Sequence, residues 1–180
     1  MWIITLAVMV INTTGAVFWI QAIFYAKSVL EFNALEVSYL IAASGIGGLL
    51  GSFSADKLRA RLGLGVVLIG SIVLESLGFI FPLIINNVWG MASAFLWISA
   101  VGLYSSICIW SYRQEAFEEK FLGRVAGITG SLFKLLMPFG LAASGYLIAH
   151  FGIEAIFISC FVVQLFAALG LLCSQVRRVA

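Results

Sequence analysis

Two ionisable side chains, Glu75 and Lys134, lie deep inside strongly apolar stretches of the sequence. A charge at the centre of a bilayer costs at least about 2.5–3.5 kcal/mol, so each needs a partner, a water-filled cavity or neutralisation. Three interpretations stay open. The two residues form a structural ion pair, or Glu75 carries protons, or Lys134 faces a cavity and binds an acidic or carbonyl-bearing compound.

No other group of residues has the spacing of a catalytic or metal site. Cys108, Cys160 and Cys173 fall in or at the end of apolar segments without a CxxC pair, and His150 is the only histidine. Helix packing for the cysteines and an interfacial position for His150 are the simplest interpretations. We therefore expect no metal site, no cofactor and no enzymatic activity.

The composition predicts a membrane protein. The chain has 180 residues, of which 63% are hydrophobic and 10% charged, whereas about 25% of residues are charged in a soluble domain. About 20 apolar residues form a helix that spans a bilayer. We expect an all-α, polytopic domain with six spans: Met1–Ala26, Val37–Ala55, Leu62–Ile84, Val88–Tyr112, Val125–Ala149 and Ala155–Val176.

The basic residues predict the orientation of the chain. Eight of the ten lie in three regions on the same side of a six-span chain: Lys57, Arg59, Arg61, Arg113, Lys120, Arg124, Arg177 and Arg178. The positive-inside rule places this side in the cytoplasm. We expect a multi-pass protein of a bacterial inner membrane or plasma membrane, with both termini cytoplasmic, the lipid bilayer as partner and no nucleic-acid partner.

Small residues recur in the second and fifth spans. The glycines Gly47, Gly48 and Gly51 occupy the second span, and Gly123, Gly127 and Gly140 belong to the fifth. Small residues four apart let helices approach closely. Because the pattern recurs in corresponding helices, we expect two inverted three-helix repeats, residues 1–90 and 91–180. Pro138 should kink the fifth span, either as a tolerated proline or as a hinge.

The segment that follows the glycine-rich second span resembles the loop motif of the major facilitator superfamily. Ser52 matches the small residue of that motif, Asp56 the acid, Lys57 the following base and Arg61 a later base. The segment departs from the motif at Arg59, where the family prefers glycine, and at Ala60, where it prefers a base.

A second stretch is similar to the fourth-to-fifth helix region of the macrolide-efflux-like branch of the superfamily. It runs from Arg113-Gln114-Glu115 through Gly123-Arg124 to Pro138-Phe139-Gly140, and it lacks the proline common after Gln-Glu in this branch. The resemblance implies the C-terminal six helices of a twelve-helix transporter. We therefore expect a longer protein or a dimer, with an N-terminal six-helix half or a second copy as partner.

The resemblance also implies roles for individual residues. The first and fourth helices of such a half line the substrate cavity, the second and fifth border the partner half, and the third is a peripheral support. The candidate cavity residues are Asn12, Thr13, Trp19, Gln21, Trp97, Tyr104, Ser105 and Lys134. The candidate residues of a cytoplasmic gating loop are Ser52, Asp56, Lys57, Arg61, Arg113 and Arg124.

The expected function is secondary active transport by alternating access. Aromatic walls with few polar anchors suit a small amphipathic or drug-like substrate, exported in exchange for protons. Two alternatives stay open. The chain is a non-transporting fragment or membrane subunit, or it is a nutrient importer of the same superfamily.

Overall fold

The structure, a computed structural model, describes residues 2–174, except for the side chains of Trp2 and Arg113. The basic residues Arg177 and Arg178 lie outside the described residues. In the described part the chain is all helical, and six segments are long and apolar enough to cross a membrane. The helices are α1 (Trp2–Ser28), α2 (Ala34–Leu62), α3 (Leu64–Gly78), α4 (Phe81–Ile84), α5 (Val88–Ala116), α6 (Glu119–Lys134), α7 (Met137–Phe151) and α8 (Glu154–Leu172). The prediction of an all-α chain with six spans is confirmed.

Short polar or glycine-containing connections separate the spans. Asn33 caps α2 by accepting from the backbone N–H of Glu36, whose carboxylate accepts from the N–H of Asn33 in return. This reciprocal arrangement satisfies N–H groups that a helix start leaves without partners. At the other end of α2, Gly63 has φ +78°, and Gly152 between α7 and α8 has φ +81°. Only glycine adopts this backbone region without strain, so these two residues set the turns.

The fifth span is broken as the proline predicts. α6 ends at Lys134 and α7 begins at Met137, so Pro138 lies in the first turn of the new helix. Proline has no N–H to donate to the carbonyl four residues earlier, and its ring crowds that carbonyl. The predicted kink is confirmed, while the hinge role stays a prediction.

The charged segments between the predicted spans are largely helical. Asp56–Arg61 forms the last turns of α2, and the region 113–124 is divided between the end of α5 and the start of α6. These segments contain mainly Lys, Arg, Glu, Ala and Leu, which favour helix, and no proline. The chain therefore continues as helix past the apolar part, to Gly63 in one case and to Phe117–Glu118 in the other.

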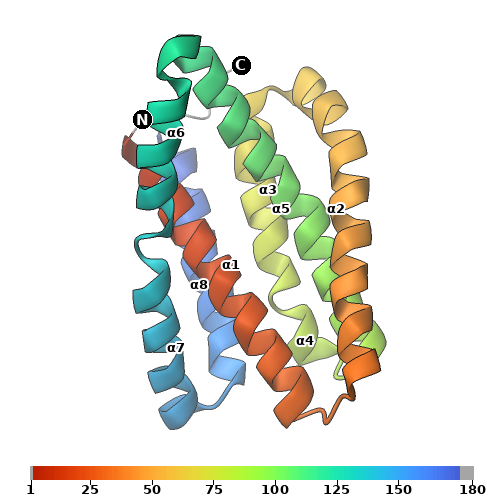
Figure 1. The fold of residues 1–180 in the computed structure, drawn as a ribbon. Helices are drawn as coiled ribbons and strands as arrows, with labels where there is room; N and C mark the ends of the chain where they lie inside the picture. Colours follow the sequence, from red (N-terminus) through yellow and green to blue (C-terminus); the bar gives the residue numbers. More distant parts are fainter. Residues whose placement is uncertain (1, 175–180) are drawn as a thin grey trace.

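The helices pack in two groups, and the main helix contact between the groups is made by α3 and α8 (Figure 1). α5 packs against α2 and α3, and α1 packs against α6, α7 and α8. α3 and α8 also contact each other and join the two groups. The fully buried ring of Phe18 on α1 contacts the rings of Phe79, Phe95 and Phe157. The first helix therefore shares an aromatic core with helices from both halves of the sequence.

Glycines allow close helix packing at some of the predicted positions. A Cβ at Gly47 would collide with the carbonyl oxygen of Leu96, and one at Gly51 with that of Ala100, both on α5. Gly140 receives the methyl group of Thr13 on α1. In contrast, a Cβ at Gly48, Gly123 or Gly127 would meet no atom within 4 Å. The predicted packing role is confirmed for Gly47, Gly51 and Gly140. Gly48, Gly123 and Gly127 instead face open space.

Replacing Gly47 with alanine should force α2 away from α5. The added methyl group meets backbone that has no other rotamer to adopt, so we expect the free energy of unfolding to fall by about 1–3 kcal/mol. Thermal unfolding of the purified protein in one detergent measures this. Gly45→Ala is the matched control, because its methyl group meets nothing within 4 Å, and it should stabilise α2 by up to about 1 kcal/mol. Equal effects of the two substitutions would contradict the packing assignment.

Candidate functional site

Two neighbouring cavities lie between α1 and the helices around it. The central cavity, of about 330 Å³, is bounded by α1, α5, Glu75 of α3 and Met137 at the start of α7. The side cavity, of about 300 Å³, lies between α1, α5 and α6. Both cavities are lined by Val8, Asn12, Ser106 and Ile109, so they are adjacent along α1 and α5.

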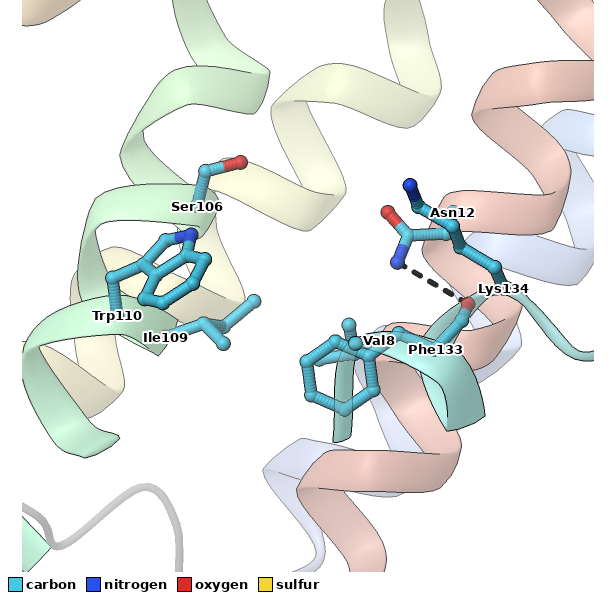
Figure 2. A pocket seen from close by; sticks show the side chains of 8 residues that line it. Val8, Asn12, Ser106, Ile109, Trp110, Phe133 and Lys134 are labelled. Carbon is cyan, nitrogen blue, oxygen red and sulfur yellow. Dashed lines mark hydrogen bonds between the residues drawn. The ribbon is translucent and has the colours of Figure 1, made fainter. Parts of the chain in front are cut away.

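Lys134 lines the side cavity (Figure 2). It projects from the last residue of α6 beside Asn12 of α1, while Ser106 and Trp110 of α5 line the opposite wall. Asn12 Nδ2 donates to the carbonyl oxygen of Phe133 at 3.3 Å. Because α6 ends here, carbonyls of its last turn lack partners within the helix. The side chain of Asn12 satisfies one of them and links α1 to the break before Pro138.

Glu75 is held by a buried amide from the last helix. Its side chain is buried, and its Oε2 accepts from Nε2 of Gln164 on α8 at 2.9 Å. The other end of that amide is also bound, because Thr14 of α1 donates to Gln164 Oε1 at 2.5 Å. Thr14, Gln164 and Glu75 form a buried polar chain that connects α1, α8 and α3. We call this set of three residues the polar chain.

The second carboxylate oxygen of Glu75 lies toward α5. A Cβ added at Gly102 would be 2.9 Å from Oε1 and 3.9 Å from Oε2. Glu75 and Gly102 both line the central cavity, and Oε1 accepts no hydrogen bond from the described residues. The absence of a side chain at Gly102 therefore leaves the space in which this oxygen meets the cavity.

Of the three interpretations of Glu75 and Lys134, the structural ion pair is not formed. The ion pairs among described side chains join Arg59 to Glu115 and Lys120 to Glu118. Glu75 instead has an uncharged amide as its partner, and Lys134 lines the neighbouring cavity. The third helix was expected to be a peripheral support that does not line the cavity. Its residue Glu75 nevertheless reaches the central cavity, through the gap at Gly102.

The other candidate cavity residues divide into three groups. Trp19 and Ser105 line the central cavity, whereas Thr13 lines a third, apolar pocket between α1, α7 and α8. The remaining candidates line neither the central nor the side cavity and instead bond to neighbouring helices. Gln21 donates to Ser144 at 2.8 Å, Trp97 donates to the Leu74 carbonyl at 2.7 Å, and Tyr104 and Ser54 share a hydrogen bond of 2.7 Å.

The predicted gating residues lie on helix surfaces. Ser52, Asp56, Lys57, Arg61 and Arg124 are all exposed, and the side chain of Arg113 lies outside the described part. At the charged end of the contact between α2 and α5, Arg59 pairs with Glu115. Arg59 stands where the family motif prefers glycine, so the motif did not identify it.

The polar chain contains two residues that the sequence reasoning did not select. Gln164 is fully buried, and Thr14 is 6% exposed. A glutamine within an apolar helix that spans a bilayer needs a hydrogen-bond partner, because hydrocarbon offers none. The signal in the sequence was thus a lone amide in the last span, but nothing in the sequence identified Glu75 as its partner.

Comparison with models of known protein families gives no match, and a search of curated proteins also finds no matching relative.

The two possible partners of Glu75 can be separated by double-mutant cycles. Because Glu75 and Gln164 are bonded, Glu75→Gln and Gln164→Leu should show a coupling energy of about 0.5–3 kcal/mol. Glu75→Gln and Lys134→Gln should add to within about 0.5 kcal/mol, as substitutions without a shared partner do. Unfolding of the single and double variants in one detergent measures both. A larger coupling with Lys134 than with Gln164 would contradict the observed pairing.

Proposed function

We propose that this chain is the C-terminal six-helix half of a transporter of the major facilitator type. It exports a small amphipathic compound in exchange for protons, by alternating access. The observation that carries the proposal is the pair of adjacent cavities at the level of Glu75, near the middle of the span Leu64–Ile84. Their lining combines aromatic and aliphatic side chains with a few polar ones, which is typical of sites for amphipathic organic molecules.

The helix contacts support an inverted repeat. An inverted repeat would make the first, second and third spans equivalent to the fourth, fifth and sixth. Each main contact between two helices then has an equivalent contact between the corresponding two helices. The pair α2–α5 corresponds to α1 with α6 and α7, and the pair α3–α5 corresponds to α1–α8. The contact between α3 and α8 corresponds to itself. Such symmetry favours two related triplets of opposite direction, with the substrate site between them.

The open faces of α2 and α6 support a partner half. Gly48 on α2 and Gly123 and Gly127 on α6 have no neighbouring atom that an added Cβ would meet within 4 Å. Close helix approach in a membrane requires such small residues. An N-terminal six-helix half, or a second copy of the chain, would cover these faces and close the cavities from the other side.

The ends and breaks of the helices then have roles in the transport cycle. Arg59 and Glu115 join α2 to α5 on the side that carries the basic residues, which the positive-inside rule places in the cytoplasm. The helix break before Pro138 lies beside both cavities, since Lys134 lines one and Met137 the other. Movement at this break would change the width of the cavities as the two halves rock against each other.

Transport by the reconstituted chain tests the proposal. In proteoliposomes with an imposed pH gradient, we expect protein-dependent movement of members of a panel of cationic, neutral and anionic amphipathic dyes. Ser106→Trp should abolish it, because Ser106 lines both cavities and a tryptophan would fill them. Ser93→Trp is the matched control, since Ser93 is exposed elsewhere on α5, and it should transport like the unmodified chain.

Absence of transport of every dye by the correctly inserted chain, alone and with a six-helix partner, would contradict the proposal. It would favour a non-transporting membrane subunit. Movement of polar nutrients inward, with no movement of the dyes, would favour an importer.

A further inference from the structure

The hydrogen bonds of Gln164 determine which carboxylate oxygen of Glu75 is already occupied. Gln164 Nε2 lies 2.9 Å from Glu75 Oε2 and 3.4 Å from the carbonyl oxygen of Ile72. A carbonyl oxygen only accepts, so the amide must present its NH₂ group to α3. The hydroxyl of Thr14, which donates to Gln164 Oε1, holds the amide in this orientation. Glu75 Oε2 is therefore committed as an acceptor.

The other oxygen, Oε1, is therefore the carboxylate atom that is free to accept a hydrogen bond from a ligand. It lies next to Gly102, on the side where Glu75 and Gly102 line the central cavity. Glu75 is 7% exposed, and none of the ion pairs among the described side chains involves it. A buried carboxylate without a cationic partner is strongly disfavoured. A positive charge on the cavity side of Oε1 would compensate the ionised form of this carboxylate.

The lining of the central cavity indicates which kind of cation fits. Ile11, Ile98 and Trp19 give it apolar and aromatic walls, and the indole of Trp19 is a surface on which cations bind favourably. In the described part of the chain no group of three or more His, Cys, Asp or Glu side chains gathers as a metal site would require. A volume of about 330 Å³ is at the lower end of the range for organic ligands.

We propose that Glu75 Oε1 binds the ammonium group of an amphipathic organic cation in the central cavity. Gln164, held by Thr14, is the positioning residue that directs this oxygen, and Gly102 provides the opening. The inference rests on the proposed transport function and adds the substrate class. It also assigns a specificity role to Gln164 and Gly102, which the sequence did not single out.

A matched pair of probes isolates the charge. The chain in lipid nanodiscs is titrated with 1-naphthylmethylamine, which is protonated at neutral pH, and with 1-naphthylmethanol, which is neutral and of nearly the same shape. Naphthalene fluorescence reports binding, and empty nanodiscs correct for partition into lipid. The quantity compared is the ratio of the two affinities, because a general loss of structure changes both alike.

Three substitutions should lower this ratio. Glu75→Gln removes the charge and should reduce the ratio at least about tenfold, as expected for a charged hydrogen bond. Gln164→Leu releases the carboxylate and should reduce the ratio about threefold or more, with the affinity for the alcohol unchanged. Gly102→Ala should act in the same direction, because its methyl group would displace Oε1. Gly70→Ala, on the same helix as Glu75 and with no atom within 4 Å of an added Cβ, is the control and should leave the ratio unchanged.

The outcomes separate this inference from the proposed function. If the unmodified chain does not prefer the amine, or if Glu75→Gln keeps that preference, the inference is wrong, even where dyes are transported. If Gln164→Leu weakens both probes equally, its role is structural and the positioning assignment fails. A preference for the amine that depends on Glu75 supports the inference even where no dye crosses the membrane, in which case the transport proposal fails separately.

Discussion

The central constraint on this structure is the burial of one carboxylate in the middle of an apolar bundle. Glu75 lies where a charge is strongly disfavoured, and the protein offsets part of that cost with the amide of Gln164. Thr14 fixes the amide, so the polar chain connects a helix of the second triplet to two helices of the first. Partly satisfied polar networks are unfavourable in an apolar interior. The position of α8 against α1 and α3 is therefore tied to the orientation of the carboxylate that meets the central cavity.

Small residues and a helix break create the space around this carboxylate. In a bilayer, helices associate by close packing, since lipid is as apolar as the side chains. Gly47 and Gly51 bring α2 onto the backbone of α5, and Gly102 on α5 leaves room for Glu75. On the other side, α6 ends at Lys134, and Asn12 of α1 binds the Phe133 carbonyl near that end. Asn12, which binds this carbonyl, also lines both cavities.

The sequence predicted the parts of the fold that depend on local composition. Apolar length identified the six spans, and the missing N–H of Pro138 identified the break in the fifth. The helices extend beyond the predicted spans into the charged segments, because hydropathy marks the edge of the hydrocarbon and not the end of the helix. The partner of Glu75 could not be predicted, because Gln164 is 89 positions away and periodicity carries no information on which helices meet. The family resemblance assigned Trp97 and Tyr104 to the cavity, whereas they bond to α3 and α2.

Water access at the level of Glu75 tests the account most directly, because a cavity that serves transport must be reached by water. Ser106→Cys lies in both cavities, and Leu74→Cys lies on the exposed apolar surface of α3 beside Glu75. In a chain with Cys108, Cys160 and Cys173 replaced by serine, a membrane-impermeant thiol reagent should modify the cysteine at 106 from one side of the membrane. It should leave the cysteine at 74 unmodified. Modification at 74 with none at 106 would contradict the account, because the cavities would then be closed to water and filled by packed side chains.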